Sequence, residues 1–361
     1  MEGYLRTAQR NMAGARAHDW SGGGLIVTAR ANLLQQYSKM ELGMGVSINE
    51  QNRLSEIFFP IGGWKIKAAS NNPDARFAYY TTADVARSVI SGKSVWMRNA
   101  STMNDYSEIE HGMACVDAAL NGEVGQSLRA AIDRCHDGLW EDVVQRFRSW
   151  SPGIKMDTFI TCVSEHLPQE REFGRLSMWR AYGGRDGVAL ILNGQAMLAG
   201  SNGSGPLISP VEYLSKDDFV EAARHVAKGV EAATALLKTI DRYSIHDCLF
   251  HMLLFSALCV KHPGFAEERE WRIFTVPTLW NLGLKMDVEV VRGTPQHVVK
   301  LPLEVGFTRG VTELVEEVII GPCSFPHVAA RAFRQLFSDA GLRAEEASAR
   351  VTVSGIPLRH F

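Results

Sequence analysis

Between Phe265 and Phe274 the sequence carries charged residues at alternate positions. Successive side chains of an extended strand project to opposite faces, so Glu268, Glu270 and Arg272 would share one face of a strand. Burying such a row is costly unless each charge has a partner, because a charge that leaves water loses its hydration. The segment therefore predicts either a ligand-binding site or a structural ion pair.

The rest of the chain has the composition of an ordinary globular protein. Of its 361 residues, 46% are hydrophobic and 22% are charged, enough for one large core or two modest ones. Its 38 basic and 40 acidic residues nearly cancel, so no overall field draws it to nucleic acid or to anionic lipid. We predict a single domain over residues 46–361 and a partly flexible N-terminal extension over residues 1–45, where arginines lie in polar, glycine-interrupted sequence.

The cysteines and the apolar segments indicate a cytoplasmic protein. Six cysteines are widely spaced, form no Cys-x-x-Cys pair and have apolar neighbours, which is typical of buried thiols in a reducing compartment. The longest apolar run, Cys248 to Val260, is too short to span a bilayer. We therefore predict neither a membrane span nor export.

Hydrophobic periodicity predicts an α+β protein with mixed or antiparallel sheets and flanking helices. Strands are expected at 77–80, 95–96, 157–163, 187–192, 211–214, 268–276, 288–291, 297–301, 317–320 and 351–353. Helices are expected at 83–91, from 104 or 105 to 120, and at 128–147, 219–237, 249–258 and 326–337, with a helical turn at 177–182. Thr82 and Asn104 or Asp105 are the predicted helix caps.

The sequence contains only incomplete versions of common metal-binding and phosphate-binding motifs. The pairs His111 with Cys115 and Cys248 with His251 have helical spacing, but no second pair completes a zinc site, so we interpret them as core residues. The glycines from Gly183 to Gly187 precede a strand and open no helix, which favours a tight turn over a phosphate site. We therefore expect no metal.

A resemblance to a known family rests on blocks of sequence that recur in a fixed order. The blocks are Phe77–Thr82, Met103–Glu108, Phe159–Ser164 with Met178–Tyr182, Glu268–Arg272 and Val353–Pro357. Together they resemble a widespread bacterial family known only as the domain of unknown function numbered twenty-nine seventy-one. The resemblance covers roughly residues 75–360.

That family is distantly similar to the ADP-ribosyltransferase fold, and this similarity implies a split sheet and an enzyme acting on NAD. Such an enzyme transfers ADP-ribose to a protein or nucleic acid, or hydrolyses NAD, in the role of a toxin or phage-defence effector. By position, Tyr79 stands where those enzymes commonly have a histidine, with Tyr80 and Thr81 beside it. This is a departure, because a tyrosine lacks the two ring nitrogens of an imidazole.

The resemblance also assigns roles to the later blocks. Glu270, or else Glu268, would be the late glutamate that stabilises the positive charge developing on the ribose. Arg272 would pair with pyrophosphate oxygens or orient Glu270. Trp179 and Tyr182, three residues apart, would offer an aromatic surface to nicotinamide.

Two other functions remain open from the sequence. The first is a non-catalytic module that binds a ligand or a partner, in which Glu270 and Arg272 form a structural ion pair. The second is a metal-dependent nuclease with Asp105, Glu108, Glu268 and Glu270 as ligands, disfavoured by how far apart these carboxylates lie.

Overall fold

Strand β3 (Phe159–Glu165) lies at the centre of the sheet because strands pair along both of its edges. β8 (Glu270–Thr275) covers one edge from Phe159 to Ser164. The other edge is shared, with β1 (Arg76–Thr82) at the end of β3 and β2 (Ser94–Asn99) at its beginning. The sheet therefore divides at β3, and β1 and β2 lead into two separate groups of strands.

The computed structural model describes residues 48–102, 106–199, 206–279, 282–291, 293–307 and 309–357. The predicted extension over residues 1–45 lies outside the described residues, as do the predicted caps Asn104 and Asp105.

Ten strands form the main sheet, and most of their pairings are antiparallel. The order β12-β11-β4-β1-β3-β2-β10-β9 is joined by β8 and β5, which continue from the other edge of β3. The remaining bounds are β4 (Gly187–Asn193), β5 (Leu207–Pro210), β9 (Lys285–Val291), β10 (Thr294–Pro302), β11 (Val315–Ile320) and β12 (Val351–Val353). β11 and β12 are parallel, and so are β6 (Glu212–Tyr213) and β7 (Val260–Lys261), which form a second, two-stranded sheet. The predicted α+β class is confirmed.

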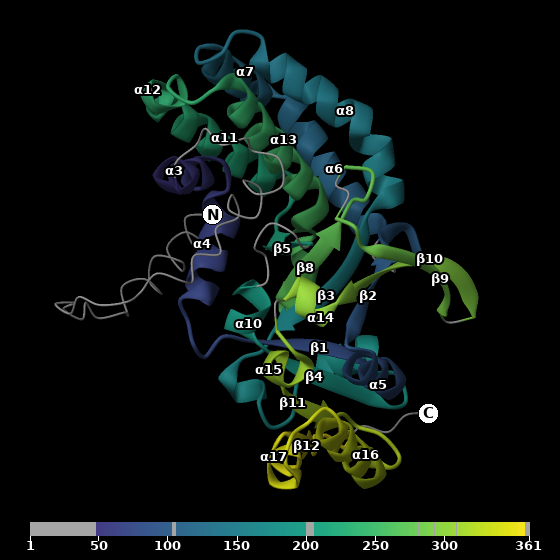
Figure 1. Ribbon diagram of the computed structural model, residues 1–361. Coiled ribbons are helices and arrows are strands. Elements are labelled where there is room, and N and C mark those ends of the chain that lie inside the picture. Colours follow the sequence, from purple (N-terminus) through teal and green to yellow (C-terminus); the bar gives the residue numbers. More distant parts are fainter. Residues whose placement is uncertain are drawn as a thin grey trace, which may run out of the picture.

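Helix α13 (Arg242–Cys259) is the centre of the helical layer. Almost all of its side chains are buried, as expected for a helix that is apolar on every side. It begins at Asp241, whose carboxylate accepts a hydrogen bond from the backbone N–H of Ser244 at 2.9 Å. The helices around it, which gather above the sheet in Figure 1, are α3 (Ile48–Phe58), α6 (Tyr106–Asn121), α7 (Glu123–Asp133), α8 (Leu139–Asp157), α11 (Lys216–Ala232) and α12 (Thr234–Leu237).

The remaining helices pack on other parts of the sheet, most of them at its β1-β4-β11-β12 end. α16 packs on α5, α17, β11 and β12, at the bottom of Figure 1. The bounds are α4 (Pro60–Ser70), α5 (Ala83–Gly92), α10 (Gly194–Ala199), α14 (Leu303–Gly306), α15 (Val311–Leu314), α16 (Pro326–Asp339) and α17 (Ala344–Ala349). Within the described residues no helix combines the length and the apolar character needed to cross a membrane.

Three predicted elements differ from the structure. The helix predicted at 219–237 is two helices, α11 and α12, with Ala233 between them. The helix predicted at 128–147 is two helices, because Gly138 adopts a positive φ of 67° between α7 and α8. The strand predicted from Glu268 begins at Glu270, because residues 263–268 form a 3-10 helix and Arg269 adopts a positive φ of 45°. Thr82 does precede α5, but its side chain makes no capping hydrogen bond.

Trp179 anchors a small second core on the face of β1 opposite the main one. It begins a π-helical turn (Trp179–Gly183) and is 1% exposed, with its ring 4.8 Å from that of Tyr80, edge to face. Glycines let the backbone approach this ring: a Cβ on Gly321 would lie 2.8 Å from it, and one on Gly174 would lie 2.7 Å from it. The indole N–H donates to the carbonyl of Phe173 at 2.8 Å.

Replacing Gly321 with alanine is expected to lower the free energy of unfolding by about 1–3 kcal/mol, because the new Cβ would overlap the Trp179 ring. Gly229→Ala in α11 is the control. Nothing lies within 4 Å of that position, and alanine favours the helix by up to about 1 kcal/mol. Urea-induced unfolding measures both variants, and equal effects would contradict tight packing around Trp179.

Candidate functional site

Glu270 and Arg272 of β8, together with Glu268 just before the strand, form ion pairs around or beside Lys261 of β7. Glu270 Oε1 lies 2.8 Å from Arg272 Nε, and Glu270 Oε2 lies 3.0 Å from Lys261 Nζ. The same Lys261 Nζ is 2.5 Å from Glu268 Oε2. Two carboxylates therefore face two cations, and both oxygens of Glu270 are bound.

This group is buried, so its charges depend on one another. Glu270 is 6% exposed, Arg272 is 1% exposed, and Lys261 has no exposed surface. Burial by itself would raise the pKa of Glu270, but the charges of Arg272 and Lys261 outweigh it and hold the pKa at about 2. Glu270 is thus an ionised carboxylate whose negative charge is already neutralised within the fold.

Tyr79 and Thr81 lie on β1 where the sheet divides, beyond the two residues that pair with β3. Burial raises the pKa of Tyr79, while hydrogen bonds with the side chains of Thr161 and Thr81 oppose the increase. On β2, Arg98 donates to the side chain of Gln296 at 3.2 Å. Polar side chains from β1, β2, β3 and β10 therefore occupy the region of the division.

Tyr80 and Trp179 lie together on the opposite face of β1, and the buried Arg175 connects Tyr80 to the 3-10 helix that precedes β8. The backbone N–H of Arg175 donates to the Tyr80 hydroxyl at 2.9 Å, and its guanidinium donates to the carbonyl of Glu268 at 2.9 Å. Burial raises the pKa of Tyr80 to about 12. Tyr182 is half-buried beside this cluster. The packed ring of Trp179 leaves no open face for a stacked nicotinamide.

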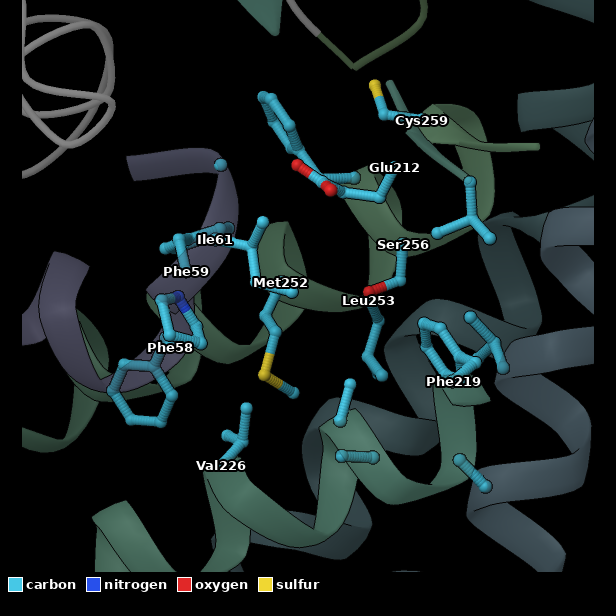
Figure 2. Close-up of a pocket in the computed structure, with 18 of the residues that line it drawn as sticks. Phe58, Phe59, Ile61, Glu212, Phe219, Val226, Met252, Leu253, Ser256 and Cys259 are labelled. Atoms are coloured by element: carbon cyan, nitrogen blue, oxygen red, sulfur yellow. The ribbon is translucent and has the colours of Figure 1, made fainter. Parts of the chain in front are cut away.

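The described residues also form a partly open, largely apolar pocket that the sequence does not reveal. It lies between the start of α4 and helices α11 and α13, beside β5 and β6, and has a volume of about 140 Å³. Figure 2 shows Phe58, Ile61, Phe219, Val226, Met252 and Leu253 among its walls. Its lining comes from segments far apart in the chain, so no single motif marks it.

Among the described residues, Glu212 of β6 is the one acidic side chain that lines this pocket, and Figure 2 shows its carboxylate at the end away from Val226. Glu212 Oε2 lies 3.1 Å from Lys65 Nζ of α4. Glu212 Oε1 is buried and has no hydrogen-bond partner within the described part of the chain. Burial raises the pKa of Glu212, and Lys65 opposes the increase.

The sequence analysis missed Lys261, Arg175 and Glu212. Two of them leave a detectable signal: Lys261 directly follows the apolar run that ends at Val260, and Glu212 is the one charge between Val211 and Leu214. A lone charge in an apolar segment predicts a buried partner or a buried site. Arg175 lies in polar sequence and leaves no comparable signal.

Comparison with known families gives one match. The sequence model of a family described as "Protein of unknown function (DUF2971)" matches residues 178–273. The resemblance to DUF2971 is confirmed over this segment. The DUF2971 segment begins beside Trp179 and ends in β8, so it contains Glu212, Lys261, Glu268, Glu270 and Arg272. No curated protein and no solved structure matches the chain.

Removing the charge of Glu270 is expected to destabilise the fold, because Lys261 and Arg272 would remain buried with one carboxylate fewer. Glu270→Gln is expected to lower the free energy of unfolding at pH 7 by about 3–5 kcal/mol. The exposed Glu304→Gln, in α14, is the control and is expected to have little effect.

The pH dependence of this loss follows from the sign of the pKa shift. The folded pKa of Glu270, about 2, is below its ordinary value of 4.5, so its stabilisation is complete above about pH 5 and is lost as the pH falls towards 2. The difference in urea midpoint between wild type and Glu270→Gln is expected to shrink over that interval. A difference that stays constant down to pH 3 would contradict the electrostatic role.

Proposed function

We propose that this chain is a ligand-binding protein whose pocket between α4, α11 and α13 takes a small, largely apolar molecule. The observation that carries the proposal is a largely apolar pocket of about 140 Å³ whose lining includes the carboxylate side chain of Glu212. Ligand pockets are typically apolar with a few polar groups that orient the ligand. The walls of this pocket and Glu212 have that composition.

The charged side chains of Glu270 and Arg272 in β8 have a structural role, because they pair with each other and with Lys261. This role leaves the pocket as the candidate binding site. Each charge of Glu270, Arg272 and Lys261 has a partner at 3.0 Å or less. Arg272 also donates to the carbonyl of Leu258, at the end of α13. These contacts fix the end of α13 and the β6–β7 pair, both of which line the pocket.

Toluene is a suitable first probe, because it is apolar and compatible in size with the cavity. Its addition is expected to raise the Tm of the wild-type protein in a concentration-dependent way, since a ligand that binds only the folded state stabilises it. Ala223→Phe, which places a ring in the pocket from α11, is expected to abolish this increase.

Ala130→Phe on the exposed side of α7 is the matched control, and we expect it to keep the response to toluene. If toluene leaves the wild-type Tm unchanged, or if Ala223→Phe responds like wild type, the pocket does not bind small apolar molecules and the proposal fails.

A second candidate is the NAD-consuming ADP-ribosyltransferase that the family resemblance implies. The division of the sheet at β3 favours it, because a split sheet is what that resemblance predicts, and Tyr79 and Thr81 lie at the division. Glu268 is the more accessible of the two glutamates, with its side chain 19% exposed, against 6% for Glu270. In that case the acceptor of ADP-ribose would be a protein or a nucleic acid. The resemblance implies that such an enzyme acts as a toxin or a phage-defence effector.

Incubating the purified chain with labelled NAD and cell extract tests this candidate. If it holds, free nicotinamide or labelled macromolecules appear, and Glu268→Gln and Tyr79→Phe each lower the rate by at least about tenfold. Glu304→Gln is the control and is expected to retain the full rate. If wild-type protein releases no nicotinamide and labels nothing, NAD is not its substrate.

A further inference from the structure

One residue on the wall of the pocket stays partly exposed within an otherwise buried stretch of helix. From Asp247 to Cys259 every residue of α13 is buried except Ser256, which keeps part of its surface. Side chains three and four positions apart share one face of a helix. The residues at those distances from Ser256 also line the pocket, and they are Met252, Leu253, Cys259 and Val260. Ser256 therefore lies at the centre of the face that α13 presents to the pocket.

The exposed surface of Ser256 opens into the pocket, because packed side chains cover the neighbouring turns of α13. Figure 2 shows the Ser256 side-chain oxygen turned towards Leu253 and away from Cys259. A molecule inside the pocket can therefore reach this hydroxyl.

Two of the described residues in the lining carry a hydroxyl group, and only one of these groups has a partner. The hydroxyl of Ser209 donates to the carbonyl of Pro210 at 3.0 Å. The hydroxyl of Ser256 makes no hydrogen bond to any described residue. It does not even donate to the carbonyl one turn back, as serines within helices often do. The hydroxyl of Ser256 is therefore available to a ligand.

A ligand that fills the pocket displaces water from Ser256. A plain hydrocarbon would leave the hydroxyl without a partner, and an unmade hydrogen bond at a covered polar group is destabilising. A ligand with its own hydroxyl or carbonyl restores the bond, because the serine O–H can donate and its oxygen can also accept.

The other walls favour a ligand without a charge. Phe219, Val226 and Leu253 are apolar, and moving a charge from water to such surroundings is costly. The carboxylate of Glu212 would repel an anion, and its pairing with Lys65 Nζ at 3.1 Å leaves it little attraction for a cation.

We propose that the ligand of this pocket is a small uncharged molecule with an apolar body and one hydroxyl or carbonyl group that hydrogen-bonds to Ser256. This inference rests on the proposed binding function, and it names the ligand class and the residue that selects it. The pocket volume of about 140 Å³ is similar to that of a protein cavity that holds benzene, about 150 Å³, so single-ring compounds are suitable probes.

Calorimetric titration of the full chain with probes of matched shape tests the inference. Benzyl alcohol, ethylbenzene and benzylamine carry a hydroxyl, a methyl and an ammonium group on the same body, and benzoate supplies an anion. Ser256→Ala is expected to weaken the binding of benzyl alcohol by about two- to tenfold, the effect of losing one hydrogen bond. The same variant is expected to bind ethylbenzene at least as tightly as the wild type does. Benzylamine and benzoate are expected to bind the wild type more weakly than benzyl alcohol.

Ser127→Ala in α7 is the matched control. Its hydroxyl donates to the carbonyl of Glu123 at 3.0 Å, outside the pocket, so we expect wild-type affinities for both probes. Ser256→Ala is expected to fold, because alanine favours a helix and the Ser256 hydroxyl makes no bond to the described residues.

The outcomes separate this inference from the proposal beneath it. If Ser256→Ala changes the binding of benzyl alcohol and ethylbenzene equally, or if benzylamine or benzoate binds the wild type more tightly than benzyl alcohol, the inference is overturned and the pocket remains a binding site. If no probe binds, or if binding persists in Ala223→Phe, the inference and the proposed function both fail.

Discussion

The contact of Glu270 with Arg272 and Lys261 is the interaction on which the arrangement of the other elements depends. It joins β8 to β7, and through the Arg272 bond to Leu258 it also holds the last turn of α13. Buried charges are stable only when all of them are paired. The strand that carries Glu270 is therefore held in one register beside β3, and β6 and β7 are positioned with it.

The two-stranded sheet β6–β7 separates two different environments. One face presents Lys261 and Tyr213 to the carboxylate and backbone N–H of Glu270, where every charge has a close partner. The other face presents Glu212 to the apolar pocket, and there Glu212 Oε2 pairs with Lys65 Nζ at 3.1 Å. This contrast is why the proposed function is assigned to the pocket and the structural role to Glu270.

The sequence predicts a helix or a strand correctly where the spacing of its apolar residues alone decides which of the two forms. The periodicity over 326–337 and the apolar segment at 187–192 correspond to α16 and β4, and the class is α+β as expected. The prediction failed where backbone conformation rather than side-chain pattern decides. Gly138 and Arg269 take positive φ values that periodicity does not detect, so one predicted helix is two and Glu268 lies outside the strand.

The sequence by itself determined that Glu268, Glu270 and Arg272 need partners, because the cost of burying a charge does not depend on the fold. Only the tertiary structure decided that Lys261 and Arg272 supply them, and that Arg175 connects Tyr80 to the carbonyl of Glu268. The pocket likewise exists only in three dimensions. Its walls come from segments on either side of residue 200, and they meet because α13 buries almost all of its surface between α6, α8 and the sheet. Long-range packing of this kind has no signature in the local order of residues.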